Sequence, residues 1–334
     1  MNDVSAHAQA PGRHCPIRYR YGARAIAGAP ARAAHTLYIV GGLYGNTAAL
    51  QTVLEMSASE AEPPRLCFNG DFNWFDIDDE SFDAINAAVL AHDAIAGNVE
   101  AELGPGDAGE AGCGCAYPET VDEATVSRSN RIHARLRQCA LRHPELVAAL
   151  STLPMFARYE VGALRVGVVH GDAESLAGWR FGHAALDQPG GLDWLAMACD
   201  IADVDLFASS HTCLPVVRQA HRHGGLAAVI NNGAAGMPNF RSTGFGLLSR
   251  ISTTPSPIPP VYGMRLGEVF IEALPIHYDR EHWLAQFERN WPPGSDAWAS
   301  YAQRINEGPD WLLQQAHSRG HAQRSFNSTD GVRI

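Results

Sequence analysis

The sequence predicts an α/β fold in which two mixed β-sheets form a sandwich with helices on its outer faces. In the first third of the chain, short apolar strands alternate with helical segments, which is typical of a parallel sheet. In the second half, apolar strands follow one another with short turns between them, as in antiparallel pairs. The 334 residues, of which 46% are hydrophobic, suffice to bury the core of such a fold.

The first part of the chain contains three predicted strands separated by two helices. The first strand stops at two glycines, and Asn46 is suited to cap the following helix because its side chain can accept a backbone N–H bond. The second strand ends at Gly70-Asp71, and the third ends at Gly97-Asn98. The predicted elements are strands 35–40, 66–68 and 94–96 and helices 47–56 and 81–92, with an acidic loop at 72–80.

The remainder is predicted to hold a long loop, then helices and a series of strands. Residues 101–120 are glycine-rich and carry Cys113 and Cys115, and long loops in compact domains are often functional. Apolar periodicity predicts helices 122–141, 144–150, 192–201, 279–289 and 296–305 and strands 156–161, 164–169, 206–208, 216–220, 226–230, 244–251 and 267–276.

The regular pattern indicates a single domain over residues 35–315. Residues 1–34 are rich in alanine, arginine, glycine and proline without a sustained period, so we expect a partly disordered surface extension. Residues 316–334 are expected to form a polar tail.

Composition limits the partners and the chemistry. A net charge of −11 argues against binding of a nucleic-acid backbone, and no apolar run approaches the ~20 residues of a membrane span. The first residues lack the apolar core of a secretion signal and the chain has seven cysteines, so we expect a cytoplasmic protein with reduced thiols. The absence of lysine excludes a P-loop lysine and a Schiff-base lysine.

Four polar residues stand at the carboxyl ends of predicted apolar strands: Asp71, Asn98, His170 and His211. A single residue of this kind means little, but four in this position would meet at the edge of a sheet where ligands bind in α/β folds. One carboxylate, one amide oxygen and two imidazoles suit a divalent ion such as zinc, manganese or iron. The sequence therefore predicts a metal site.

The order of these motifs resembles the calcineurin-like metallophosphoesterase superfamily, particularly its compact bacterial phosphodiesterase-like branch. The chain has strand-Gly70-Asp71, Gly97-Asn98-x-Glu100, His170-Gly171 and His211-Thr212 followed by Pro215, in the family's order. Gly45-Asn46, the stretch 232–238 and the stretch 276–279 add weaker matches, and the similarity spans residues 36–315. It implies a four-layer αββα sandwich and phosphoester hydrolysis.

The resemblance also implies two metal ions about 3.5–4 Å apart, bridged by Asp71, with a bridging hydroxide as the nucleophile. Asn98, His170 and His211 would complete one site, and all of its ligands are present. Asn46 and Asn98 would face the phosphate, and Tyr44 is a candidate catalytic residue beside them. The expected substrate is a small phosphorylated molecule, such as a nucleotide.

The other metal site is altered. The family's first motif, Asp-x-His-Gly-Asn, reads Gly42-Leu43-Tyr44-Gly45-Asn46, and its final Gly-His-Thr-His reads Ser210-His211-Thr212-Cys213. Cys213 as a thiolate or Tyr44 as a phenolate could replace the missing ligands. Val99 stands where many members have a catalytic histidine. We expect one tightly bound divalent ion per chain, and a second ion if Cys213 or Tyr44 acts as a ligand.

Three functions fit this pattern. The first is a phosphoester hydrolase, acting on monoesters or diesters. The second is a non-catalytic protein that binds a phosphorylated ligand, a metal or a protein partner. The third is thiol chemistry through Cys213. A serine hydrolase built on Ser209, His211 and Asp172 is disfavoured because the Gly-x-Ser-x-Gly elbow is missing.

Several neighbouring residues are open to two interpretations. Cys113 and Cys115 could face the cleft, although cysteines of this kind more often pack in the interior. The acidic residues 76–80 are expected to form a solvated turn, from which Asp76 could reach the metal. The aromatic residues of 72–75 could contact a substrate or cover the core. We favour the second interpretation, that they cover the core. Arg180 could bind phosphate or pack on the surface.

Overall fold

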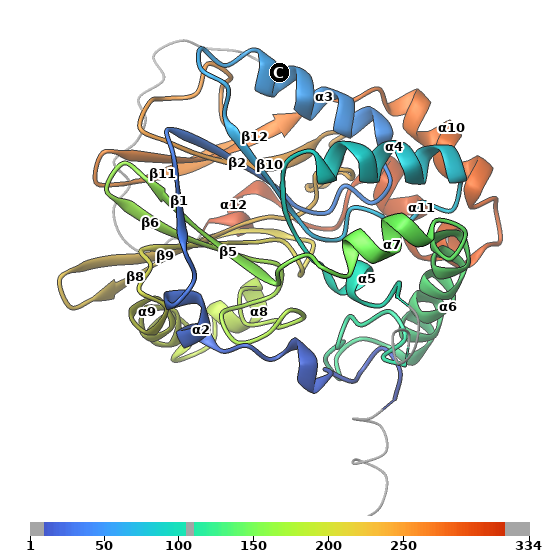
Figure 1. Ribbon diagram of the computed structural model, residues 1–334, viewed down its shortest axis with the longest axis horizontal. Coiled ribbons are helices and arrows are strands. Elements are labelled where there is room, and N and C mark those ends of the chain that lie inside the picture. Colours follow the sequence, from blue (N-terminus) through green and yellow to red (C-terminus); the bar gives the residue numbers. More distant parts are fainter. Residues whose placement is uncertain (1–9, 105–109, 318–334) are drawn as a thin grey trace, which may run out of the picture.

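Two six-stranded sheets lie face to face in the computed structural model, which describes residues 10–104 and 110–317 (Figure 1). Both sheets are mixed, because parallel and antiparallel pairs occur in each. The first sheet has the order β1 (Ala31–Ala34), β5 (Phe156–Val161), β6 (Leu164–Val169), β7 (Leu206–Ser209), β9 (Gly225–Asn232) and β8 (Pro215–Arg222). The second has the order β11 (Tyr262–Leu266), β12 (Val269–Ile276), β10 (Gly246–Ser252), β2 (Thr36–Val40), β3 (Arg65–Asn69) and β4 (Asp93–Ile95).

Helices cover both outer faces, so the predicted αββα sandwich is confirmed. Figure 1 shows α3 (Thr47–Ala58), α4 (Asp79–Leu90) and α10 (Arg280–Asn290) outside the second sheet, and α2 (Ala23–Ala27) and α9 (Gly191–Ala202) outside the first. The other helices are α5 (Asn98–Ala101), α6 (Glu123–Ala140), α7 (Pro144–Leu150), α8 (His183–Leu186), α11 (Asp296–Glu307) and α12 (Leu313–Ala316). A single 3-10 turn, η1, spans Ile17–Tyr19.

The apolar strands are buried on both faces, which explains their near-continuous hydrophobic sequence. In β2, Leu37 and Ile39 pack in the core between the two sheets, whereas Tyr38 and Val40 pack against the helices. Because successive strand residues point to opposite faces, one apolar strand contributes side chains to two separate cores. A third core lies between the first sheet and helices α2 and α9.

The N-terminal expectation needs a correction for residues 10–34. This stretch contains η1, α2 and β1, and β1 extends the first sheet by pairing in parallel with β5. Tyr19 and Ile26 are fully buried. The segment covers core that the rest of the chain would expose, and its small and polar composition hid this from periodicity. The part of the expectation that concerns residues 1–9 lies outside the described residues.

The C-terminal expectation falls largely on residues 318–334, which also lie outside the described residues. At residues 316–317 the chain is still folded, since Ala316 is buried and His317 forms a bridge with Val217. In the described part of the chain, no helix combines the length and apolar character needed to cross a bilayer.

Candidate metal centre

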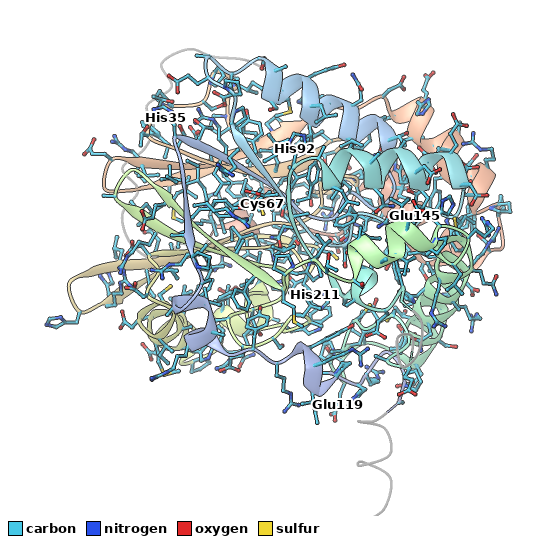
Figure 2. The ribbon with its side chains drawn as sticks, in the orientation of Figure 1. His35, Cys67, His92, Glu119, Glu145 and His211 are labelled. Carbon is cyan, nitrogen blue, oxygen red and sulfur yellow. The ribbon has the colours of Figure 1, made fainter. Side chains whose placement is uncertain are left out.

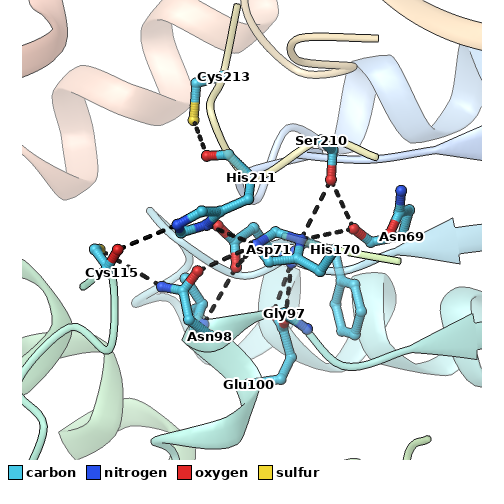
Figure 3. Close-up of polar contacts among 12 residues, drawn as sticks. Asn69, Asp71, Gly97, Asn98, Glu100, Cys115, His170, Ser210, His211 and Cys213 are labelled. Atoms are coloured by element: carbon cyan, nitrogen blue, oxygen red, sulfur yellow. Dashed lines mark hydrogen bonds and ion pairs between the residues drawn. The ribbon is translucent and has the colours of Figure 1, made fainter. Parts of the chain in front are cut away.

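The four predicted metal ligands come from two strand ends in each sheet. Asp71 follows β3 and Asn98 follows β4 in the second sheet, while His170 follows β6 and His211 follows β7 in the first. Facing strand ends therefore bring the four side chains together (Figure 3). All four are at least nine-tenths buried. Figure 2 shows His211 inside the molecule, whereas Glu119 lies at its surface.

A hydrogen bond from the ring nitrogen that does not face the other ligands fixes the orientation of His170. Its Nδ1 lies 2.9 Å from the carbonyl oxygen of Asn69, which can only accept, so Nδ1–H donates there. The other ring nitrogen, Nε2, lies 3.1 Å from Asn98 Oδ1 and 3.3 Å from Asp71 Oδ1. Two acceptor oxygens thus face Nε2, and this arrangement calls for a positive charge between them, as a proton or as a metal ion.

His211 and Asn98 are oriented in the same way. His211 Nε2 lies 3.1 Å from the carbonyl oxygen of Cys115, so it carries the proton and leaves the Nδ1 lone pair pointing at His170 Nε2, 3.1 Å away. The Asn98 amide donates to the carbonyl of Cys113 at 2.8 Å, which turns its oxygen inward. Hydrogen bonds to backbone carbonyls commonly fix the tautomer of metal-binding histidines.

The donor set therefore fits a divalent ion. Ligand atoms of Asp71, His170 and His211 lie within 4.8 Å of one another. Together with Asn98 Oδ1 they offer two nitrogens and two oxygens, a mixture that suits zinc, manganese or iron. The oxygens and the lone pair of His211 converge at His170 Nε2.

The charges in the centre agree with this geometry. Burial disfavours ionisation of Asp71, but the His170 and His211 side chains and the Val99 N–H outweigh it and hold the pKa of Asp71 below its usual value. Burial and repulsion from His170 lower the pKa of His211 to about 3, so its imidazole is neutral. For His170, the attraction of Asp71 outweighs burial and raises the pKa.

Glu100 supports the loop that carries Asp71. Its carboxylate accepts backbone N–H bonds from Asp71 at 2.8 Å, Phe72 at 3.1 Å and Gly97 at 3.1 Å. Burial and the charge of Asp71 raise the pKa of Glu100 to about 7. The sequence motif contained Glu100, but nothing in the sequence showed that it would organise the metal loop.

Tyr44 and Cys213 form a pair beside the centre and do not join it. The Tyr44 hydroxyl lies 2.8 Å from Cys213 Sγ, and the thiol donates to the carbonyl of His211 at 3.2 Å. Burial, the neighbouring thiol and Asp71 raise the pKa of Tyr44 well above its usual value, which argues against a phenolate ligand. Burial also raises the pKa of Cys213.

A narrow pocket of about 50 Å³ opens onto the centre. Asp71, His211, Tyr44 and Cys213 all line it, and no arginine is among its described lining residues. Its remaining walls are largely aromatic and come from loops and helices far apart in sequence: Trp74, Val99, Cys115, Tyr117, Trp179 and Tyr301. Tyr117, Trp179 and Tyr301 carry no local signal, because only the tertiary fold brings them here.

Asn46 was predicted to face the phosphate, but the structure gives it a capping role. Its Oδ1 accepts the Ala49 N–H at 2.9 Å and its Nδ2 donates to the Gly236 carbonyl at 2.9 Å. The side chain is fully buried, so both polar ends are used in holding the start of α3. The predicted helix cap is present, and the predicted phosphate contact needs correction.

The structure shows the surroundings of the residues for which the sequence allowed two interpretations. Cys113 and Cys115 are buried, and they serve the centre through their backbone carbonyls. Asp76 is fully buried and bonds to Ser81, so the expected solvated turn is wrong at this residue. Arg180 stacks on Trp194 with 3.9 Å to the ring centroid, a surface packing role. The aromatic residues of the acidic loop are buried, in agreement with the interpretation that they cover the core: Phe72, Trp74 and Phe75.

Solved structures share this architecture. No protein-family model matches the chain, and no curated protein matches it in sequence. A metallophosphoesterase from Sphaerobacter thermophilus matches with a TM-score of 0.54 and 16% identity, covering 83% of this chain and 100% of that one. A hypothetical protein from Pyrococcus horikoshii OT3 matches with a TM-score of 0.55 and 14% identity, covering 84% and 100%.

The sandwich with polar residues at facing strand ends is thus an α/β fold built from two packed mixed sheets. More narrowly, it is the calcineurin-like metallophosphoesterase fold, as the motifs had indicated.

Proposed function

We propose that this protein is a metal-dependent phosphoester hydrolase with one divalent ion per chain. One observation carries the proposal: hydrogen bonds to backbone carbonyls turn the lone pairs of His211 and Asn98 toward His170 Nε2, which Asp71 Oδ1 also faces. A protein of this fold with such a donor set is equipped for hydrolysis of a phosphoester. The fold likeness supports the reaction class and leaves the substrate open.

The residues around the centre have separable tasks. A divalent ion bound there would act as a Lewis acid and activate a water for attack on phosphorus. Asp71, Asn98, His170 and His211 would hold it, with Asn69 and Cys115 fixing the two imidazoles from behind. Glu100 keeps the Asp71 loop in place through its backbone bonds. The aromatic walls restrict water around the reacting group.

The charge of the pocket favours a phosphodiester over a phosphomonoester. A divalent ion and the Asp71 carboxylate together leave about one positive charge, and the described lining contains no arginine; Arg304 lies outside the lining and donates to the Cys213 carbonyl at 2.6 Å. A singly charged diester matches this charge, whereas a monoester dianion would be undercompensated. The rings of Trp74, Trp179 and Tyr301 suit an apolar substituent, which would lie at the mouth of the pocket because about 50 Å³ admits little more than the phosphate group itself.

Metal content and turnover test this function together. Protein purified without added metal is expected to carry about one equivalent of manganese, iron or zinc, and to hydrolyse a nitrophenyl diester faster than the matching monoester. Asp71→Ala and His211→Ala should each lose the metal and nearly all turnover. His92→Ala, at an exposed histidine, is the matched control and should behave like the parent.

Turnover that survives both ligand substitutions would refute the hydrolase. Two equivalents of metal would refute the single-ion centre.

A non-catalytic binding role is the second candidate. The observation that favours it is the narrowness of the pocket together with the Tyr44–Cys213 pair that stands where further ligands would be needed. On this hypothesis the protein binds phosphate or a phosphorylated ligand with its metal but shows no turnover on any ester. The same panel of esters separates the two candidates.

The cytoplasmic location stays a prediction. All seven cysteines are free, as a reducing compartment would require.

A further inference from the structure

The Tyr44 hydroxyl has an unusual setting for a buried phenol. It lines the same pocket as Asp71 and His211, and the side chain is only 3% exposed. Its hydrogen-bond partner is the thiol of Cys213, at 2.8 Å. Sulfur is a weak acceptor, so the hydroxyl would readily exchange this hydrogen bond for one to a better acceptor while keeping its proton.

The loop that carries Tyr44 is tied directly to the loop that carries Asp71. Gly42 N–H donates to the Gly70 carbonyl at 3.1 Å, Tyr44 N–H to the Asp71 carbonyl at 3.2 Å, and Gly45 N–H to the Phe72 carbonyl at 2.7 Å. These three bonds hold the phenol in a fixed relation to the metal ligand. A donor meant to contact a metal-bound group needs such fixing.

The ring also occupies space that a side chain at residue 42 would need. A Cβ added to Gly42 would lie 2.8 Å from Cε2, Cζ and Oη of Tyr44. The phenol can therefore take this position only because residue 42 is glycine.

Backbone strain gathers at the same place. Tyr44, Asp71 and Cys213 have φ of 56°, 54° and 58°, in the left-handed region that non-glycine residues rarely adopt. Such conformations cost energy, and they persist where the surroundings fix them, commonly at functional sites. All three of these residues line the pocket.

We propose that Tyr44 is a catalytic residue whose hydroxyl donates a hydrogen bond to a phosphoryl oxygen of the ligand at the metal. On ligand binding, the O–H leaves the sulfur of Cys213 and turns to the anionic oxygen, which is the stronger acceptor. The neutral phenol thereby supplies the second electrophilic contact in a centre that holds one ion. This inference rests on the proposed function, because it takes the metal at Asp71, Asn98, His170 and His211 as given.

Tyr44→Phe tests the proposal, because it removes the hydroxyl and keeps the ring over Gly42. Metal content is measured first, and inorganic phosphate is then titrated by calorimetry into the manganese-loaded parent and variant. We expect one equivalent of metal in both and a phosphate Kd about 10- to 100-fold higher in Tyr44→Phe, the usual effect of losing a hydrogen bond to a charged group. Tyr38→Phe is the matched control, because it removes a buried tyrosine hydroxyl that bonds to Glu60 at 2.7 Å and does not line the pocket, and it should retain the parent's phosphate affinity within about threefold.

Equal phosphate affinity in the parent and Tyr44→Phe, with one metal ion in each, would overturn the role of Tyr44 and leave the metal centre standing. Absence of metal from the parent itself would overturn both. Loss of metal from Tyr44→Phe alone would also overturn the proposal, because it would make Tyr44 a support of the ligands. The calorimetric readout does not depend on turnover.

Discussion

The chemistry of the centre depends on which atom of each side chain faces inward. Asn98 would be of no use as a ligand with its amide reversed, and the Cys113 carbonyl prevents this by accepting the amide protons. The Cys115 carbonyl does the same for His211, and the Trp179 indole N–H holds that carbonyl at 3.0 Å. Residues with no direct part in metal binding thus decide whether the ligands can bind.

Gly42 allows the first prediction about a single residue. Alanine at this position would bring its Cβ against the Tyr44 ring, in addition to the cost of a left-handed φ of 67°. We expect Gly42→Ala to lower the free energy of unfolding by roughly 2–4 kcal/mol. Urea denaturation measures the change.

Gly267→Ala is the matched control for this substitution. Gly267 has a φ of 58° but nothing within 4 Å of an added Cβ, so only the backbone cost of about 1 kcal/mol applies. Equal losses in the two variants would show that the Tyr44 ring does not fill the space above Gly42. In a Tyr44→Ala background, Gly42→Ala should cost less than it does in the parent, because the ring that the added Cβ would meet is absent.

Between elements, Asp205 joins β6 and β8 to the start of β7. Its carboxylate accepts from the Arg165 backbone N–H at 3.0 Å and from Arg165 Nη2 at 2.8 Å, and it also pairs with Arg222. Burial alone would raise the pKa of Asp205, but these partners outweigh it and the pKa lies below its usual value. The unfolded chain therefore binds a proton more readily than the folded one.

This lowered pKa predicts how Asp205 contributes to stability with pH. The contribution is fully present above the unfolded pKa near 3.9 and is lost as pH falls through the lower folded value. Asp205→Asn should cost roughly 1–3 kcal/mol at pH 7, and the gap to the parent should shrink below about pH 4. Urea unfolding at a series of pH values measures this. Asp193→Asn, at an exposed helical position, should change little, and a gap for Asp205→Asn that stays constant down to pH 3 would contradict the assignment.

The sequence predicted elements where a hydrophobic pattern was strong and missed them where it was weak. The buried strand β2 and the long helix α6 were found because apolar residues recur with the right period. Strand β1, with the sequence ARAA and three exposed residues, has no such pattern and exists because β5 offers it an edge. Strand β11 was missed in the same way, since β12 pairs with it across a short turn.

The metal centre, like the fold, was predictable only where the sequence carries a strong local pattern. Asp71, His170 and His211 were found because each follows an apolar strand, and parallel strand ends converge by geometry. The hydrogen bonds that orient them could not be found, because the donors and acceptors are backbone groups of Asn69, Cys113 and Cys115. Asn46 was misplaced because its motif is compatible with a helix cap and with a phosphate contact, and only coordinates separate the two.

For the molecule as a whole, the N-terminal segment is part of the core. Ile26 is fully buried in the cluster between the first sheet and α9, whereas Ile17, nine positions earlier, is 81% exposed. Ile26→Ala should lower the free energy of unfolding by about 2–5 kcal/mol, and Ile17→Ala should stay within about 0.5 kcal/mol of the parent. Thermal and urea unfolding compare them. Equal, small effects would show that Ile26 does not contribute to the core.

The metal centre also joins the two halves of the sandwich. Asp71 and Asn98 belong to the second sheet and His170 and His211 to the first, so the four ligands are assembled only when the sheets are packed together. The unfolded chain cannot present them at once, and an ion that binds the folded state alone stabilises it by about 2.7 kcal/mol at a hundredfold excess over Kd. Manganese should therefore raise the Tm of metal-stripped protein by roughly 4 °C. Asp71→Ala should show no such rise, whereas His92→Ala should keep it. A rise of equal size in Asp71→Ala would place the bound metal elsewhere and would remove the link between the centre and the packing of the two sheets.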